Sequence, residues 1–365
     1  MYAAVALGLI LLLGLVERWE QRRCLAVVPI RIHVNGTRGK STVTRLIHGA
    51  LCEAGLPAVG KTTGTAARLL MPDGSERPVP RRARPNIREQ LWALRQARLA
   101  GARAAVLECM AVRPELQWVA EQEMVRATIG VITNVRPDHA EVMGRTLEQM
   151  AACLANTIPR RGLLVHGEPR FAEFFHKRAA EAGTAVRAVA APLPGEDAVW
   201  LAEDMALALE VTRALGIADE VALAGMRRAV PDPGALHWVT LRGEVTALDA
   251  SAANDPESLA GLLAEQREAA GRPALLVYNH RSDRPERLRT FLSAPLPGEV
   301  VVTGDPPGAA LRLARRPAGQ KVAYLSERRL WPVLRQKAAG PGAPLVVLCG
   351  NTKGWHYLRE QEGEP

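Results

Sequence analysis

Residues 35–42 read N-G-T-R-G-K-S-T and combine the residue types that phosphate chemistry requires. Glycines let backbone N–H groups approach an anion, the lysine can reach terminal phosphates, and the hydroxyl of Ser41 can bind Mg²⁺. The pattern is G-x-x-G-K-S rather than the longer G-x-x-x-x-G-K-[ST], whose first glycine would fall on Val34. A bare G-x-x-G-K-S also occurs in ordinary glycine turns, so the motif alone leaves both interpretations open.

The segments on either side of the motif favour phosphate binding. The apolar run 27–34 is typical of a β-strand, and apolar residues at 43, 46, 47, 50, 51 and 54 follow the spacing of one helical face. Gly55 lies where a glycine commonly ends a helix. A strand, a glycine loop and a helix N-terminus in this order form an anion site. We therefore predict that the nucleotide is bound by Asn35, Gly36, Thr37, Arg38, Gly39, Lys40, Ser41 and Thr42.

Two further strand-like runs end in side chains that suit a metal site. Glu108 follows the apolar run 104–107, and His139 comes shortly after the run 128–133. Open α/β sheets bind ligands at the carboxyl ends of their strands, and carboxylates are natural ligands of Mg²⁺. A lone histidine is more often structural, but its place after a strand makes His139 a candidate. We predict that Lys40, Glu108 and His139 are catalytic, and that Ser41, Glu108 and His139 hold the metal.

A second small, polar loop reads G-K-T-T-G-T at residues 60–65. It is either a plain turn or a cover over phosphates or a substrate. Lysines 40, 61 and 353 all lie in G-K or T-K-G turns, where a compact point charge can meet a phosphate. On the second interpretation we predict substrate contacts from Lys61, Thr63 and Thr65.

Length and composition indicate a folded α/β protein with more than one domain. The chain has 365 residues, of which 48% are hydrophobic, enough for two or three domains with ample core. Strand-like and helix-like segments alternate along most of it, which favours α/β architecture. The run P-D-P-G at 231–234 is the clearest boundary signal. We predict an ATP-binding domain at 25–233 and a smaller α/β, Rossmann-like domain at 234–365.

Residues 1–16 form an uncharged apolar run. As a helix this run would reach about 24 Å, a little short of a ~30 Å hydrocarbon core. A cleaved signal peptide is the rival interpretation, but no basic region precedes the run and no small-residue cleavage site follows it. Arginines at 18, 22 and 23 come next, which by the positive-inside rule places the bulk of the chain in the cytoplasm. We predict a single N-terminal transmembrane helix, residues 1–24, that anchors cytoplasmic catalytic domains in the cell membrane.

Charge and cysteine usage exclude several classes of function. The net charge of +9 is mostly arginine interleaved with glutamate, without the basic and aromatic pattern of a nucleic-acid site. It fits a solvated surface, although a basic surface can also attract a polyanion. The five cysteines form no C-x-x-C pair, which argues against a disulfide framework or a zinc site and fits a reducing cytoplasm. We expect no nucleic-acid partner.

Taken together, the motifs resemble a known superfamily. N-G-T-R-G-K-S-T after a strand, Glu108, and N-V-R-P-D-H-A-E-V-M-G are similar to the central ATPase domain of the Mur ligases and folylpolyglutamate synthases. Within it, the chain most resembles the amide ligase subunits of bacterial poly-γ-glutamate capsule synthases. The further shared segments are V-G-K-T-T-G-T-A-A-R, P-N-I-R-E-Q, E-C-M-A-V, P-D-P-G-A, A-A-N-D and N-H-R-S-D-R.

This resemblance implies a reaction and its participants. The domain at 25–233 would be a Mur-ligase-like P-loop ATPase with a mostly parallel sheet. ATP, with Mg²⁺, would phosphorylate a γ-carboxylate, and the amine of glutamate would attack the acyl phosphate to form an amide. Asp249 would contact the ribose with Asn254 nearby, and Arg281 would bind substrate. The expected partners are glutamate, the growing poly-γ-glutamate chain, a small multispanning membrane subunit, other capsule-synthase subunits and the cytoplasmic membrane.

Several departures from the family pattern leave alternatives open. Many Mur ligases carry a carbamylated lysine beyond the D-H motif, but no lysine lies between Lys61 and Lys177. The family's arginine after P-x-P-G-A is His237 here, and an expected asparagine is Asp204. One alternative is a folate or other small-molecule glutamate ligase, a class that usually lacks a membrane anchor. The other is a membrane-tethered P-loop ATPase that powers export or assembly.

Overall fold

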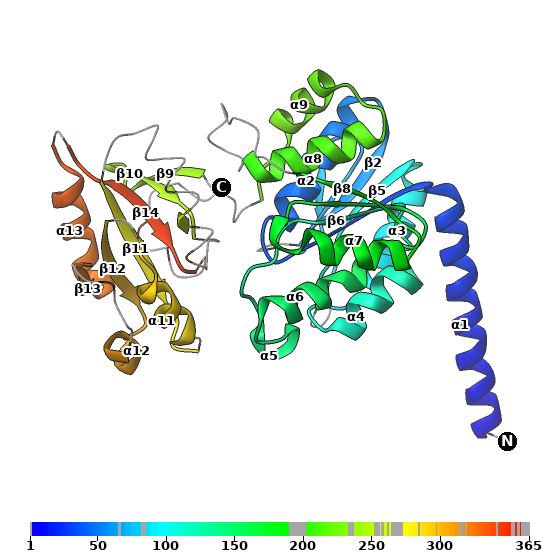
Figure 1. Cartoon of the computed structure of the whole chain (residues 1–365), viewed down its shortest axis with the longest axis horizontal. Coiled ribbons are helices and arrows are strands. Elements are labelled where there is room, and N and C mark those ends of the chain that lie inside the picture. Colours follow the sequence, from blue (N-terminus) through cyan, green and yellow to red (C-terminus); the bar gives the residue numbers. More distant parts are fainter. Residues whose placement is uncertain are drawn as a thin grey trace. The chain divides into compact units, whose positions relative to one another are not determined.

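The computed structural model divides into two compact units, one that ends at Asp232 and one that begins at Pro233 (Figure 1). The structure describes residues 2–64, 67–81, 85–189, 202–232, 237–251, 256, 259–260, 263, 273–283, 285–296, 298–313, 317, 320–340, 342–351, 355 and 358.

The first unit is built on an eight-stranded sheet with the order β4-β3-β2-β5-β1-β6-β7-β8. Its strands are β1 (Ile30–Asn35), β2 (Ala58–Lys61), β3 (Arg68–Leu70), β4 (Glu76–Pro78), β5 (Ala104–Glu108), β6 (Ile129–Ile132), β7 (Leu163–His166) and β8 (Ala185–Ala188). Strands β2, β5, β1, β6, β7 and β8 run parallel. The short strands β3 and β4 pair antiparallel at one edge. The predicted mostly parallel sheet is confirmed.

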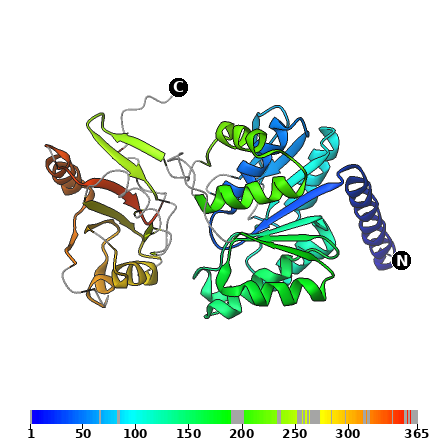
Figure 2. The same cartoon turned by 45° about the horizontal axis from the view of Figure 1, so that its top comes forward.

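Helices cover both faces of this sheet (Figures 1 and 2). The helices on one face are α2 (Lys40–Glu53), α8 (Ala202–Ala214) and α9 (Asp219–Arg228). Those on the other face are α3 (Glu89–Leu99), α4 (Pro114–Val119), α6 (Leu147–Leu154) and α7 (Ala172–Glu181). Strand β5 carries apolar side chains on both faces of the sheet, and helices on both faces bury them. Val106 packs toward α2, whereas the next residue, Leu107, packs toward α3. Short helical turns are η1 (Ala120–Val125), α5 (Ala140–Met143), η2 (Ala155–Thr157) and η3 (Pro169–Phe171).

Strand β1 lies at the centre of the sheet, between β5 and β6. Val34 pairs in register with Glu108 on one side and with Val131 on the other. The chain leaves β1 through α2 toward β2 and β5, and later crosses to β6 on the opposite side. The carboxyl ends of β5, β1 and β6 therefore meet at a topological switch point, the place where open α/β sheets bind ligands.

The second unit holds a six-stranded sheet with the order β13-β12-β11-β14-β10-β9. Its strands are β9 (His237–Leu241), β10 (Val245–Asp249), β11 (Ala274–His280), β12 (Glu299–Gly304), β13 (Val322–Tyr324) and β14 (Leu345–Cys349). Its helices include α11 (Pro285–Ser293), α12 (Gly308–Leu313) and α13 (Glu327–Ala338). Only β9 pairs antiparallel among these strands, and apolar clusters form on both faces of the sheet. The α/β class predicted for this region is confirmed.

Helix α1 (Tyr2–Val27) is one continuous helix of 26 residues that belongs to the first unit. Its last turns join the fold: Cys24 is buried, and Glu20 pairs with Arg95 of α3 at 3.0 Å. In the described part of the chain no helix is long and apolar enough to cross a membrane. The predicted transmembrane helix at 1–24 is therefore not supported. Its uncharged stretch ends at Val16, and the same helix continues directly into charged residues.

Candidate active site

The loop after β1 has a backbone that only glycine fits at two positions. Gly36 and Gly39 have φ values of 134° and 78°, in the region that side chains rarely adopt. A methyl group on Gly36 would also clash with Thr133, and one on Gly39 would lie 3.1 Å from one carboxylate oxygen of Asp204 and closer to the other. Helix α2 begins immediately afterwards, at Lys40. The loop thus leads directly into a helix N-terminus, the arrangement of an anion site.

Residues that follow β6 hold this loop in place through hydrogen bonds and an ion pair. The Thr37 hydroxyl donates to Asn134 Oδ1 at 2.8 Å, and the Arg38 N–H donates to the same oxygen at 3.0 Å. The Arg136 N–H donates to Thr37 Oγ1 at 2.8 Å. The Arg38 guanidinium pairs with Asp138 at 2.9 Å. These bonds connect the N-G-T-R-G-K-S-T and D-H motifs directly, although 100 residues separate Arg38 from Asp138.

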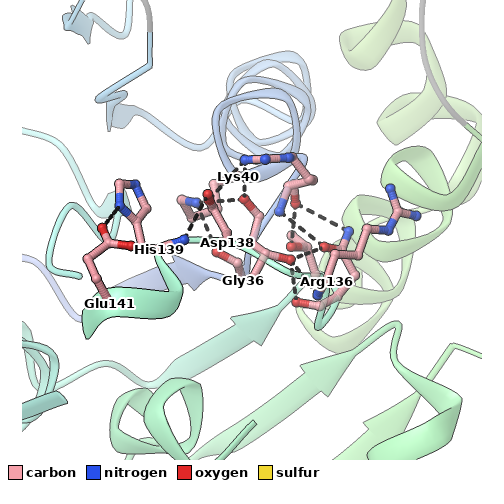
Figure 3. Close-up of polar contacts among 10 residues, drawn as sticks. Gly36, Lys40, Arg136, Asp138, His139 and Glu141 are labelled. Carbon is pink, nitrogen blue, oxygen red and sulfur yellow. Dashed lines mark hydrogen bonds and ion pairs between the residues drawn. The ribbon is translucent and has the colours of Figure 1, made fainter. Parts of the chain in front are cut away.

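Lys40 lies along the loop from which it projects (Figure 3). Its Nζ donates to the carbonyl of Gly36 at 2.8 Å and to that of Thr37 at 3.2 Å. The Asn35 side chain turns instead into the interior, where it donates to Gln117 at 2.9 Å and to Thr157 at 3.1 Å. The side chains of Asn35 and Thr37 therefore stabilise the loop from within, and the Thr37 N–H adds a bond to the Asn134 carbonyl at 3.2 Å.

Ser41 and Glu108 lie side by side at the end of β5. The Glu108 carboxylate is 3% exposed, and its Oε2 accepts bonds from Ser41 Oγ at 2.8 Å and from the Thr63 N–H at 2.6 Å. Gln90 of α3 holds the backbone of the same residue, since its Nε2 donates to the Glu108 carbonyl at 2.8 Å. Hydroxyl and carboxylate oxygens are the hard donors that Mg²⁺ prefers. The pair fits a magnesium site.

His139 lines a pocket of about 200 Å³ together with Lys40 and Glu108. It adopts a left-handed conformation with φ of 42°, and its Nδ1 lies 3.2 Å from Glu141 Oε1 (Figure 3). Among the residues with a described position, no three His, Cys, Asp or Glu side chains are grouped so as to hold a metal. A magnesium ion held by Ser41 and Glu108 would take its other ligands from water and phosphate oxygens, as this ion commonly does.

Lys61 does not reach the pocket. It is fully buried at the end of β2, and its Nζ lies 3.2 Å from Glu89 of α3. Burial lowers the pKa of Lys61, an effect that Glu89 and Glu108 oppose. The structure gives this lysine an internal partner, Glu89, and its contact with a substrate stays a prediction. Strand β2 pairs with β5 so that Lys61 lies in register with Leu107. Thr63 does line the pocket, and Thr65 lies outside the described residues.

The remaining predicted residues belong to the second unit. Asp249 ends β10, is buried, and accepts a bond from the Ser251 N–H at 2.9 Å. Arg281 follows β11 and makes two bonds to Asp283, at 2.9 and 2.6 Å. Asn254 lies outside the described residues. The two described side chains are thus at carboxyl ends of parallel strands, where ligands of such sheets bind.

A buried ion pair joins the strand that leads into the phosphate loop to a neighbouring helical turn, and it was not predicted from the sequence. His33 of β1 lies 2.8 Å from Glu121 of the π-helical turn η1. Burial alone would lower the pKa of His33, but Cys109 and Glu121 beside it raise that pKa to about 10. The imidazolium ties η1 to the strand that carries the phosphate loop. Its only sequence signal was a histidine within the mostly apolar run 27–34.

Gln90 and Asp204 are two further residues at the site that were not predicted as functional. Gln90 lies within P-N-I-R-E-Q and occupies the buried face of α3. Asp204 lies in the first turn of α8 and is 2% exposed, with its carboxylate against Gly39. The sequence marked both positions through the family resemblance, but only the packing of α3 and α8 brings them to the loop.

Comparison with known proteins agrees with this architecture. Residues 34–181 match the Mur ligase middle domain, and residues 237–361 match the poly-gamma-glutamate synthase CapB C-terminal domain. The chain is 38% identical over 319 residues to the PGA synthase CapB of Bacillus subtilis (strain 168), a match that covers 82% of this chain and 81% of that protein. The chain belongs to the CapB family.

Other similar proteins extend the comparison. The capsule biosynthesis protein CapB of Bacillus anthracis is 39% identical over 304 residues, which covers 78% of this chain and 65% of that CapB protein. Among solved structures, a bifunctional folylpolyglutamate synthase/dihydrofolate synthase from Yersinia pestis matches with a TM-score of 0.65 at 18% identity, over 94% of this chain and 90% of that one. The same enzyme has been solved with AMPPNP and a Mn ion. At this identity the likeness shows that the chain shares the fold of that enzyme.

Proposed function

We propose that this CapB-family chain is an ATP-dependent amide ligase that polymerises glutamate into poly-γ-glutamate. The observation that carries the proposal is the 38% identity to a PGA synthase CapB over 82% of the chain. The pocket supports it, because a glycine loop, a lysine and a buried carboxylate beside a hydroxyl are what phosphoryl transfer requires.

The reaction we propose has two steps. The γ-carboxylate of the growing chain attacks the terminal phosphorus of ATP, so an O–P bond forms and ADP leaves. The amine of a glutamate then attacks the carbonyl carbon of the resulting γ-glutamyl phosphate. An amide C–N bond forms, the amine loses a proton, and phosphate departs. One ATP is thereby converted to ADP and phosphate for each amide bond.

Residues of the first unit have different roles in these two steps. Lys40 and N–H groups of the loop stabilise charge on the transferred phosphoryl group. The Lys40 ammonium has three donors, of which the carbonyls of Gly36 and Thr37 take two. Ser41 and Glu108 would hold Mg²⁺, which would supply further neutralisation of phosphate charge. His139, at the same pocket, is proposed to bind metal or substrate oxygen through a water molecule.

In the second unit, we propose that Asp249 binds the ribose and Arg281 the carboxylate of a glutamate. Asp249 is an acceptor at a strand end, as ribose hydroxyls require. Arg281 presents a planar fork that matches a carboxylate, and its present partner is a carboxylate, Asp283.

The product distinguishes this function from its alternatives. We expect cells that co-express the chain with its membrane partners to make a polymer that contains only glutamate, resists α-peptidases and yields glutamate on acid hydrolysis. The matched control is the same complex with Lys40→Ala. If an ATPase-competent complex incorporates labelled glutamate only onto a folate or a UDP-linked acceptor, the chain is a different ligase. ATP hydrolysis that does not depend on glutamate, without amide product, would favour an export ATPase.

We further propose that α1 holds the chain at the cytoplasmic face of the cell membrane, beside other capsule-synthase subunits. Large apolar side chains from Val5 to Val16 are exposed on this helix, and arginines follow them at 18, 22 and 23. Apolar side chains that enter the headgroup region and cations that meet anionic lipids together favour surface binding. Tethering near a membrane partner would raise the effective concentration of chain ends at the exit.

Cell fractionation tests this location. We expect the full chain to sediment with membranes, and an Ile10→Glu, Leu13→Glu variant to move largely to the supernatant, because both side chains are exposed on α1 and a carboxylate resists entry into lipid. Protease added outside intact cells should leave both units uncut. Equal sedimentation of the two proteins, or cleavage by external protease, would contradict the proposal.

A further inference from the structure

Gln90 of α3 binds the main chain of the residue that supplies the carboxylate of the candidate metal site. Its side chain is fully buried, and its Nε2 donates to the Glu108 carbonyl at 2.8 Å. Glu108 ends β5, and its carboxylate accepts bonds from Ser41 Oγ at 2.8 Å and from the Thr63 N–H at 2.6 Å. The carbonyl and the carboxylate of one residue are therefore held by donors from different elements.

The pairing of β5 with β2 explains why this carbonyl takes a side-chain donor. The Cys109 N–H donates to β1, so the preceding residue, Glu108, directs its backbone groups toward β2. The Thr62 N–H donates to β3, so the next N–H, that of Thr63, faces β5. A regular parallel ladder would join the Thr63 N–H to the Glu108 carbonyl. Here that N–H donates to the Glu108 carboxylate, and the Gln90 amide takes its place at the carbonyl.

The first turn of α3 binds the ends of both strands. Glu89, the first residue of the helix, lies 3.2 Å from Nζ of Lys61 at the end of β2, and Gln90 bonds to Glu108 at the end of β5. Lys61, Gln90 and Glu108 are each at most 3% exposed, and an unsatisfied buried carbonyl is costly. If the Gln90 amide were lost, the Thr63 N–H would be the donor that restores the regular ladder, and it would then leave the carboxylate.

We propose that Gln90 is a positioning residue of the metal site. Because it binds the Glu108 carbonyl, the Thr63 N–H remains on the carboxylate and holds it beside Ser41, where the two oxygens together suit a divalent cation. This inference rests on the proposed nucleotide and metal function and adds to it a residue that acts through Glu108. Partners that orient a metal ligand typically contribute about tenfold or more to metal affinity.

The substitution Gln90→Met tests this role, because it keeps a long unbranched side chain and removes the amide donor. The probe is AMPPNP, whose dissociation constant is measured by titration calorimetry on the full chain, once with Mg²⁺ and once with EDTA. The ratio of the two constants gives the contribution of the metal to binding. We expect this ratio to fall about tenfold in the variant, and the constant measured with EDTA to change by less than about twofold.

The matched control is Gln122→Met. Gln122 Nε2 donates to the Ile158 carbonyl at 2.9 Å, which is the same kind of bond, and Gln122 does not line the pocket. Both variants lose a bond from a side-chain amide to the main chain, so both should unfold at a lower temperature, whereas only Gln90→Met should lower the ratio. If Gln90→Met is unstable, Gln90→Leu removes the same donor with a side chain that suits the apolar neighbours Ala93 and Leu94.

The outcomes separate this inference from the proposed function. An unchanged ratio in folded Gln90→Met, an equal loss of affinity with Mg²⁺ and with EDTA, or an equal fall of the ratio in Gln122→Met would overturn the role given to Gln90. If Glu108→Gln lowers the ratio and Gln90→Met does not, the metal site stands and only that role is wrong. If Mg²⁺ does not strengthen the binding of AMPPNP to the wild-type chain, the metal site itself fails, and the inference fails with it.

Discussion

Replacing Lys40 by alanine is expected to lower ATP turnover and amide formation by about 100-fold or more, equivalent to ~3 kcal/mol of transition-state stabilisation. Lys40 is the cation of the loop whose Nζ lies at the pocket, held by the carbonyls of Gly36 and Thr37. The charge that develops on the transferred phosphoryl group would lose its closest cationic partner. Release of ADP in the steady state, with glutamate present, measures the effect.

A matched control variant tests whether the loss of turnover is specific to Lys40. Lys177→Ala removes the same charge and side chain from an exposed position on α7, and should leave turnover unchanged. Lys40→Arg should recover little activity, because a planar fork does not replace a compact ammonium group in a tight loop. A folded Lys40→Ala protein with near-normal ATP turnover would contradict the assignment of this loop as the nucleotide site.

Replacing Glu108 by glutamine is expected to raise the Mg²⁺ concentration needed for half-maximal rate by about tenfold, and to lower the rate at saturating Mg²⁺ by about tenfold or more. The amide oxygen of glutamine can still accept bonds from Ser41 and Thr63, so the local fold should survive the substitution. What is lost is the negative charge that suits a divalent cation. Rates measured across a Mg²⁺ titration check both effects.

Two comparison variants define the site around Glu108. Glu115→Gln removes a carboxylate from an exposed position on α4 and should leave the Mg²⁺ titration as in the wild type. His139→Ala should also raise the Mg²⁺ requirement, though less, because this side chain is 37% exposed and already close to Glu141. If the Mg²⁺ titration were unaltered in both Glu108→Gln and His139→Ala, these residues would have structural roles and would not bind the metal.

The sequence was sufficient for features that depend on local order along the chain. The apolar run before Asn35, the glycines at 36 and 39 and the helical spacing after Lys40 are local, and the structure contains the corresponding strand, loop and helix. The parallel sheet was also predictable, because alternating strands and helices can close only a small set of topologies. The N-terminal apolar run was visible as well, and the structure contains a helix there, although no described helix is long and apolar enough to cross a membrane.

Tertiary structure decided which side chains the pocket receives. Strand order places β5 and β6 on either side of β1, so Glu108 and the D-H motif meet the loop from distant parts of the sequence. The same pairing turns Lys61 inward to Glu89, although its glycine-rich loop resembles a phosphate contact. Packing of α8 on α2 brings Asp204 to Gly39. Residue type and spacing indicate which chemistry a side chain can perform. Its interaction partners and its electrostatic environment are set only when elements that are distant in the sequence pack together.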